Sequence, residues 1–254
     1  MTTHNQRINH QPAFLLSTSP WRESSLLVEL FTRDHGRVAM IARSARKRQS
    51  ELRGVLVPFT PLLVSWFGSA ELKTLHRAEW LGGWPQPQGQ ALFSGLYVNE
   101  LVQKLTARED PMPTLYTALF EVMRSISQTP VHHQWAPLRY FEWTLLHALG
   151  IAPDISQDGQ GQAIDADTQY WMRAEHPPIS LNTVASLPPN SAESGVAIHG
   201  ETLTALNQHA LSSTRAQQQA LRLTRLLIDF RLPEGIHSRN ILKQIQSYYS
   251  GSDY

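Results

Sequence analysis

The sequence contains no cysteine, and this absence limits what can hold the fold together. Neither a disulfide nor a zinc site with thiolate ligands can form without it. The absence fits a reducing compartment. No apolar run approaches the roughly 20 residues of a membrane-spanning helix, and the polar residues 1–12 are unlike a signal peptide. We therefore expect a cytoplasmic protein that does not contact a membrane.

The motifs of several enzyme classes are missing as well. The sequence has no Walker loop and no Gly-x-Ser-x-Gly elbow, and Gly159-Gln160-Gly161 lacks the third glycine of a dinucleotide fingerprint. Eleven histidines are present, but none forms a pair at helical metal-ligand spacing, and the adjacent His132 and His133 do not point at one ion. We predict no metal, no cofactor and no catalytic activity.

Charge is nearly balanced over the chain, with a formal net charge of +1, but it is unevenly distributed. Residues 1–80 carry 11 Lys and Arg against 6 Asp and Glu, whereas residues 81–254 carry 11 against 15. The cations are densest over residues 37–53, where only Glu51 opposes them. They are Arg37, Arg43, Arg46, Lys47, Arg48 and Arg53. Such a loop can follow a phosphate backbone without reading bases, and a solvated surface loop is the plain alternative.

Apolar residues follow a β pattern in the first third of the chain. Turn signals separate five expected strands, at residues 13–18, 25–32, 37–43, 56–67 and 71–80. Five short strands in this length predict a small closed barrel of the OB type, with the cations beside its strands. Four aromatic residues near the cations, Phe31, Phe59, Trp66 and Phe67, could stack bases, although a small barrel needs most of them in its core.

A helical pattern follows, with helices expected at 91–107, 113–127, 135–149, 201–209, 214–230 and 238–248. We therefore predict an α+β protein, with an N-terminal five-stranded OB-like β-barrel followed by a mainly helical C-terminal domain. The expected boundaries are a disordered tail 1–11, an OB-fold DNA-binding domain 12–82, a linker 83–90, a helical domain 91–248 with an irregular insert 151–200, and a tail 249–254. The insert includes a possible β pair at 170–173 and 196–199.

The helix expected at 135–149 carries apolar residues on two sides. Arg139, Glu142, Trp143 and Leu146 share one face, while another apolar stripe runs along a second face. Arg139 can form an ordinary surface ion pair with Glu142, which the spacing alone favours. It could instead hold the carboxylate of a partner beside an apolar groove.

Several motifs agree in order and spacing with a known family. They include Ser19-Pro20-Trp21-Arg22-Glu23, Gly36-Arg37-Val38, Pro58-Phe59-Thr60-Pro61-Leu62 and Leu138-Arg139-Tyr140-Phe141-Glu142. Over about residues 12–150 the chain resembles the RecO family of bacterial DNA repair and recombination mediators. The resemblance implies ATP-independent binding and annealing of single-stranded DNA, binding of double-stranded DNA, a place at the nucleoid, and action in the RecF pathway. Its implied partners are RecR and single-strand-binding protein, and the partnership would allow the recombinase RecA to be loaded at gaps in DNA.

The resemblance also bears on two particular regions. It implies that Arg139 meets the terminal carboxylate of the acidic, Phe-ended tail of single-strand-binding protein, with Trp143 and Leu146 lining the pocket. Many family members carry a four-cysteine zinc module where this chain has residues 151–185. Without cysteine, we expect this segment to be held by apolar contacts alone, through Ile155, Ile164 and Trp171.

Two other functions remain compatible with the sequence. The chain could be a protein–protein adaptor whose barrel binds a protein partner and whose charge is incidental. It could also be an RNA-binding OB protein. Only a nucleic-acid ligand predicts an affinity for oligonucleotides that falls steeply with salt.

Overall fold

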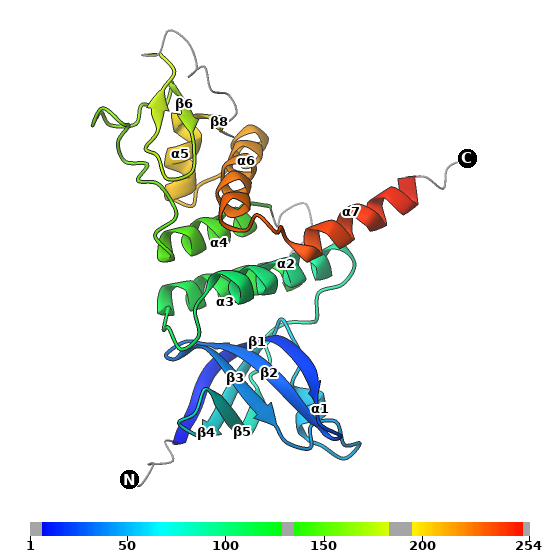
Figure 1. The fold of residues 1–254 in the computed structure, drawn as a ribbon. Coiled ribbons are helices and arrows are strands. Elements are labelled where there is room, and N and C mark those ends of the chain that lie inside the picture. Colours follow the sequence, from blue (N-terminus) through cyan, green and yellow to red (C-terminus); the bar gives the residue numbers. More distant parts are fainter. Residues whose placement is uncertain (1–6, 129–134, 183–194, 251–254) are drawn as a thin grey trace. The chain divides into compact units, whose positions relative to one another are not determined.

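The computed structural model describes residues 7–128, 135–182 and 195–250 (Figure 1). The chain forms two compact units. One consists of residues 1–130 and 236–254, and the other consists of residues 131–235. We call the first the barrel unit and the second the helical unit. Among the described residues, no helix is both long enough and apolar enough to cross a lipid bilayer.

The first five strands close into a barrel, as the sequence predicts (Figure 1). They are β1 (Arg7–Trp21), β2 (Ser25–Thr32), β3 (Gly36–Ala42), β4 (Pro61–Phe67) and β5 (Leu72–Trp80). Their order is β1-β2-β3-β5-β4, in which β3 and β5 are parallel and the other pairs are antiparallel. Because β1 pairs with both β2 and β4, the barrel has no free edge strand.

Alternation along β2 and β3 sends one set of side chains into the barrel and the other set outward. Val28 and Leu30 of β2 face the core together with Val38 and Met40 of β3, and all four are almost completely buried. The register pairs Val28 with Met40 and Leu30 with Val38. A slip of one residue would bring Glu29 into the barrel, so burial fixes this register.

Two expectations about the barrel boundaries are wrong. The tail expected over residues 1–11 is part of β1 from Arg7 onward, where Arg7 pairs with Phe67 and Ile8 with Trp66. Pairing with β4 orders this stretch in spite of its polar composition. The strand expected over 56–67 begins only at Pro61, and a short helix, α1 (Leu52–Val55), precedes it. The apolar residues before Pro61 are buried in loops, which a strand pattern does not distinguish.

One part of the barrel's outer surface, at β1 and β2, is covered by α2 (Gln90–Leu105) and α3 (Pro113–Gln128). The ring of Tyr116 lies 5.6 Å from that of Phe14 and 6.5 Å from that of Phe31, between ring centroids. The Asn99 amide donates to the carbonyl oxygens of Leu15 and Leu16, where a bulge interrupts the β1–β2 ladder. These helices therefore belong to the barrel unit, and the helical domain expected over 91–248 is not one unit.

The linker expected over residues 83–90 is also a packed segment. Trp84 is buried, and its indole N–H donates to the carbonyl oxygen of Phe59 at 2.8 Å. Its ring meets that of Phe120 on α3 edge to face, at 5.1 Å between centroids. Glycine and proline make this stretch look like a linker, but Trp84 anchors it. The last helix, α7 (His237–Ser250), includes the first two residues of the tail expected over 249–254; residues 1–6 and 251–254 lie outside the described residues.

In its described residues, the helical unit combines three helices with a small sheet. Its elements are α4 (Trp135–Ala148), β6 (Gln169–Met172), β7 (Ile179–Ser180), β8 (Val196–His199), α5 (Gly200–Asn207) and α6 (Thr214–Arg231). The sheet order is β7-β6-β8, and Tyr170 of β6 pairs with Ile198 of β8. The predicted β pair is therefore confirmed, with β7 as an additional strand that the sequence pattern did not reveal.

Polar side chains help to hold the segment that follows α4. The Asp158 carboxylate accepts hydrogen bonds from the backbone N–H groups of Gln160 and Gln162, both at 2.9 Å. Asp165 accepts from Thr168, and Tyr170 accepts from the Asp165 N–H. The expectation of apolar contacts alone is therefore wrong, although Ile155 is buried as expected. Among the described residues, no group of three or more His, Asp or Glu side chains could hold a metal ion.

Candidate nucleic-acid interface

The loop that follows β3 is attached firmly to the barrel. Ala45 is 1% exposed and belongs to the barrel core, so the loop is pinned at its centre. The backbone N–H of Arg46 donates to the carbonyl oxygen of Ser24, at 2.9 Å, in the β1–β2 turn. The side chain of Arg46 also reaches the Arg22 carbonyl oxygen. A cation on this loop is therefore held in place by the barrel rather than carried on a free strand.

Five cations of this region are exposed: Arg43, Arg46, Lys47, Arg48 and Arg53. Within the described parts of the chain, no ion pair to an acidic side chain is found for any of them. We call these five residues the cationic loop, of which the last, Arg53, lies in the short helix α1. Arg22, which is also exposed, lies beside the loop because β2 pairs with both β1 and β3. Arg22 was not among the predicted cations, although the β1–β2 hairpin that ends at Trp21 and Ser25 brings it there.

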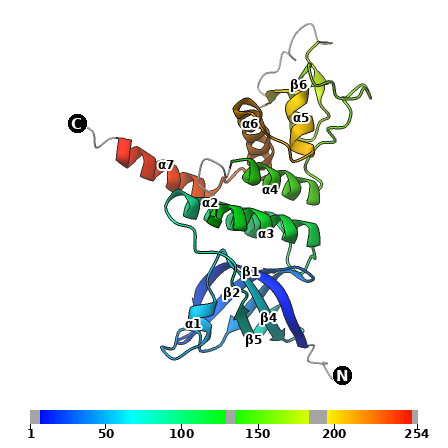
Figure 2. The ribbon, with the colours of Figure 1, turned by 180° about the vertical axis from the view of Figure 1, so that it is seen from behind.

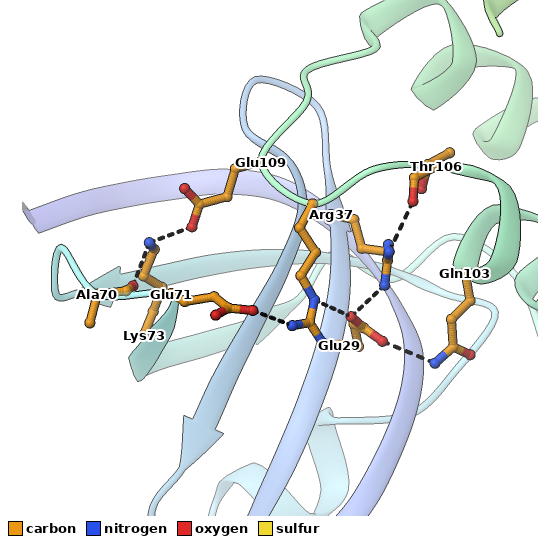
Figure 3. Close-up of polar contacts among 9 residues, drawn as sticks. Glu29, Arg37, Ala70, Glu71, Lys73, Gln103, Thr106 and Glu109 are labelled. Carbon is orange, nitrogen blue, oxygen red and sulfur yellow. Dashed lines mark hydrogen bonds and ion pairs between the residues drawn. The ribbon is translucent and has the colours of Figure 1, made fainter.

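Arg37 differs from the other predicted cations because it is committed to an ion pair. Its guanidinium donates to the Glu29 carboxylate at 2.6 Å and to the Thr106 carbonyl oxygen at 2.9 Å (Figure 3). Glu29 also accepts from Arg108 at 3.1 Å and from Gln103 at 2.9 Å. Both side chains of the Arg37–Glu29 pair are largely buried, so Arg37 is not part of the exposed cationic surface.

This network fastens the segment between α2 and α3 across the barrel (Figure 3). Arg108 donates to Glu71 at 2.6 Å, and hydrogen bonds to Glu71 and Glu29 raise the pKa of its guanidinium. Lys73 donates to Glu109 at 2.5 Å, while the Glu109 N–H donates to the Arg37 carbonyl oxygen. In OB folds the face of strands 2 and 3 commonly binds oligonucleotides. Here the segment between α2 and α3 covers part of that face through its contacts with Glu29 and Arg37. The cationic loop follows β3 at the edge of the covered part.

The aromatic residues that were considered for base stacking are mostly buried. Phe31, Phe59 and Trp66 are each at most 3% exposed, and Phe67 is partly buried. Their rings pack in the barrel core or against the helices on the barrel, which is the alternative to base stacking that the sequence also allowed. Trp80 at the end of β5 was not among the aromatic residues considered for stacking, and it is 57% exposed.

Comparison with known proteins decides the family. The model of the recombination protein O N-terminal domain matches residues 7–84, and that of the C-terminal domain matches residues 86–240. The chain belongs to the RecO family. It is 57% identical to the DNA repair protein RecO of Neisseria gonorrhoeae (strain NCCP11945) over 244 residues, which cover 95% of this chain and 96% of the relative. The RecO of Aromatoleum aromaticum is 42% identical over 96% of this chain and 99% of its own length.

On α4 the structure brings together, in the interior, the three residues that the resemblance implies for binding a partner's tail. Arg139, Trp143 and Leu146 are each at most 5% exposed. Arg139 donates to Glu142 at 2.7 Å, and Glu142 accepts in turn from the Thr224 hydroxyl on α6. Arg139 and Glu142 form the ion pair that their spacing predicts. The prediction that this pair lies on the surface is wrong, because both side chains are buried.

Three donors at this buried site lack a partner among the described residues. They are Nε and Nη1 of Arg139 and the indole N–H of Trp143. Buried donors without an acceptor are unusual, because each costs about 1–3 kcal/mol in lost hydration. A ligand with carboxylate oxygens could supply the missing acceptors.

Proposed function

We propose that this RecO family member is a DNA repair and recombination mediator that binds and anneals single-stranded DNA and helps to load the recombinase. It acts by binding rather than by catalysis. The observation that carries the proposal is the cationic loop, five exposed cations fixed on a closed OB-like barrel. Its relatives are named DNA repair proteins. Double-stranded DNA, RecR and single-strand-binding protein are the proposed partners, and the nucleoid in the cytoplasm is the proposed place of action.

The physical basis of annealing is neutralisation of phosphate charge. Two complementary strands repel one another, and cations that bind both backbones lower this repulsion. The loop carries its cations on an anchored backbone, since Ala45 is in the core and Arg46 is bonded to Ser24. It therefore loses little conformational freedom when it binds.

The test is a titration of a fluorescent single-stranded oligonucleotide at several salt concentrations. The variant Arg43→Ala/Arg46→Ala/Lys47→Ala/Arg48→Ala is expected to bind far more weakly. Its slope of log K against log salt should be shallower by up to about 3, because each single-strand phosphate contact contributes about 0.7. The fold should persist, since all four side chains are exposed.

A control variant removes the same number of charges elsewhere, from Arg33, Arg124, Arg215 and Arg231, which are all exposed. It should keep the affinity and slope of the unaltered protein. Equal losses in both variants would mean that net charge alone attracts DNA. Unchanged binding by the loop variant would place the site elsewhere, and no oligonucleotide binding at any salt would favour the protein–protein adaptor.

We further propose that α4 captures the acidic, Phe-ended tail of single-strand-binding protein. The buried donors of Arg139 and Trp143 fit a terminal carboxylate, and Leu146 offers apolar surface beside them. Because these atoms are buried in this structure, the side chains over them must move when the tail binds. Glu142 does not repel the tail as a free carboxylate would, since it is bonded to Arg139 and Thr224.

The sharpest test leaves the protein unaltered and changes the peptide. A tail peptide with a free C-terminus should bind about ten- to a hundredfold more tightly than the same peptide amidated at its C-terminus. Arg139→Ala is a poorer probe, because it removes the guanidinium that is paired with the buried Glu142, at a cost of about 3–5 kcal/mol in stability. Equal affinity for the two peptides would refute this assignment and leave the DNA-binding proposal intact.

A further inference from the structure

One large aromatic side chain of the barrel unit is left open to solvent at the end of β5. Trp80 is 57% exposed, whereas Trp66 and Trp84 are buried and Trp21 is partly buried. An indole that is open to solvent forgoes the stabilisation that burial of a large apolar side chain provides. Trp80 is paired on one side with Leu62 of β4, so its backbone position is fixed.

The strand register runs β5 in the same direction in which β3 leads into the cationic loop. β3 and β5 run parallel, and their last paired residues are Ile41 and Thr74. Beyond this point the β3 chain turns into the cationic loop, while β5 continues to Trp80. The loop leads into α1, which contacts β5. In Figures 1 and 2 the connection from β5 to α2 leaves the barrel on the side where α1 lies.

The nearest charges on β5 do not occupy the face of Trp80. Arg77 and Glu79 form an ion pair at 2.7 Å and alternate with Ala78 and Trp80 along the strand. Ala78 packs against the barrel core, as do Leu52 and Val55 of α1. By alternation Trp80 lies on the same side of β5 as Ala78, and α1, which contacts β5 and carries the exposed Arg53, packs against the same core.

We propose that Trp80 stacks against a base of single-stranded DNA whose phosphates are held by the cationic loop. This inference rests on the proposed function and extends it from backbone contacts to the bases. Every base has a π face, so stacking is tolerant of sequence and suits an annealing protein. In a duplex the base faces are already stacked on one another. Trp80 therefore favours single-stranded over double-stranded DNA.

The test compares the unaltered protein with Trp80→Ala on three probes of equal length: a thymidine oligonucleotide, its abasic counterpart and a duplex. The unaltered protein should bind the thymidine strand about 5- to 100-fold more tightly than the abasic strand, the range that stacking of one base gives. Trp80→Ala should lose most of this preference and keep its affinity for the duplex. Trp80→Phe should retain part of it, because a smaller ring still stacks.

A matched control is Trp135→Ala, which removes a tryptophan of similar exposure, 48%, from α4. It should bind all three probes as the unaltered protein does. An unchanged preference for thymidine in Trp80→Ala would overturn the stacking proposal, with the cationic loop still in place. That outcome would favour a protein-docking role for the exposed Trp80 and Leu81. No binding of any probe by the unaltered protein would instead refute the proposed function itself.

Discussion

Gly36 is a residue for which two separate constraints exclude any side chain. Its φ angle is +63°, in the left-handed region that favours glycine. A Cβ atom at this position would lie 2.0 Å from the carbonyl oxygen of Asp110, in the segment that crosses the barrel. The sequence marks Gly36 only as a turn residue between two strands. The close approach of Asp110 depends on a contact 74 positions along the chain, which no local pattern contains.

We expect Gly36→Ala to destabilise the barrel unit by roughly 3 kcal/mol, from backbone strain and from displacement of the Asp110 segment. The matched control is Gly54→Ala, since Gly54 lies in α1 and a Cβ there meets nothing within 4 Å. That variant should be neutral or gain up to about 1 kcal/mol. Denaturant unfolding measures both, and equal midpoints for the two variants would contradict the close approach.

The sequence predicts the exposed cations of the barrel unit well, but not the cation that is buried in an ion pair. The five members of the cationic loop could be predicted as a group, because their density leaves too few neighbouring acids to pair with them. Arg37 could not be separated from them. Its partner Glu29 is 8 residues away, and Gln103 and Arg108 complete the network from beyond the barrel. Periodicity does place Arg37 on the outer face, but it does not say what covers that face.

At the scale of elements, α7 is joined to α2 by a carboxylate at its N-terminus. Glu100 accepts from the backbone N–H groups of His237 and Ser238, at 2.7 and 2.9 Å, and from the Ser238 hydroxyl. Arg239 lies over the ring of Tyr97, 4.9 Å from its centroid. Burial opposes ionisation of Glu100, but the hydrogen bonds from Ser238 and His237 outweigh it and lower its pKa.

We expect Glu100→Gln to loosen α7, because it weakens charge-assisted hydrogen bonds to the first turn by about 1.5–3 kcal/mol. Hydrogen exchange at the amides of His237 and Ser238 should accelerate. The same loosening should occur in the unaltered protein as the pH falls through the lowered pKa of Glu100, beginning below the ordinary glutamate value of about 4.3. A lowered pKa stabilises the folded state above that value, and the stabilisation is lost on protonation.

The control for α7 is Glu121→Gln, which alters an exposed carboxylate paired with Arg124 on α3. Exchange at the α7 amides should not change in that variant. Glu100→Gln should also remove most of the acid-induced loosening. If its exchange rates match those of the unaltered protein across this pH range, Glu100 does not hold α7.

The helices themselves were largely predictable, whereas their partners were not. Apolar spacing gave α2 and α3 to within one or two residues at each end. Their assignment to a separate domain failed because an amphipathic stripe has the same form whichever surface it covers. The deciding contacts, Tyr116 with Phe14 and Asn99 with the β1 bulge, join residues far apart in the sequence.

At the scale of the whole molecule, the chain leaves the barrel unit after α3 and returns to it with α7. The helical unit is thus an insertion between two parts of the barrel unit. Each unit has its own buried residues, such as Leu30 in the barrel unit and Leu145 in the helical unit, both fully buried. Composition cannot reveal this arrangement, because α7 has the same helical pattern as the elements of the other unit.

We expect thermal unfolding to show two transitions, one for each unit, because chains with two cores commonly depart from two-state behaviour. Leu30→Ala should lower one transition and Leu145→Ala the other, each by the equivalent of about 2–5 kcal/mol. A metal chelator should move neither, since the chain has no thiolate ligands and polar contacts such as those of Asp158 hold the segment after α4. Calorimetry of the two variants and of the chelator-treated protein measures these transitions. A single transition that both substitutions lower equally would mean that the units unfold together. A chelator-induced shift in the transition that Leu145→Ala lowers would reveal a structural metal.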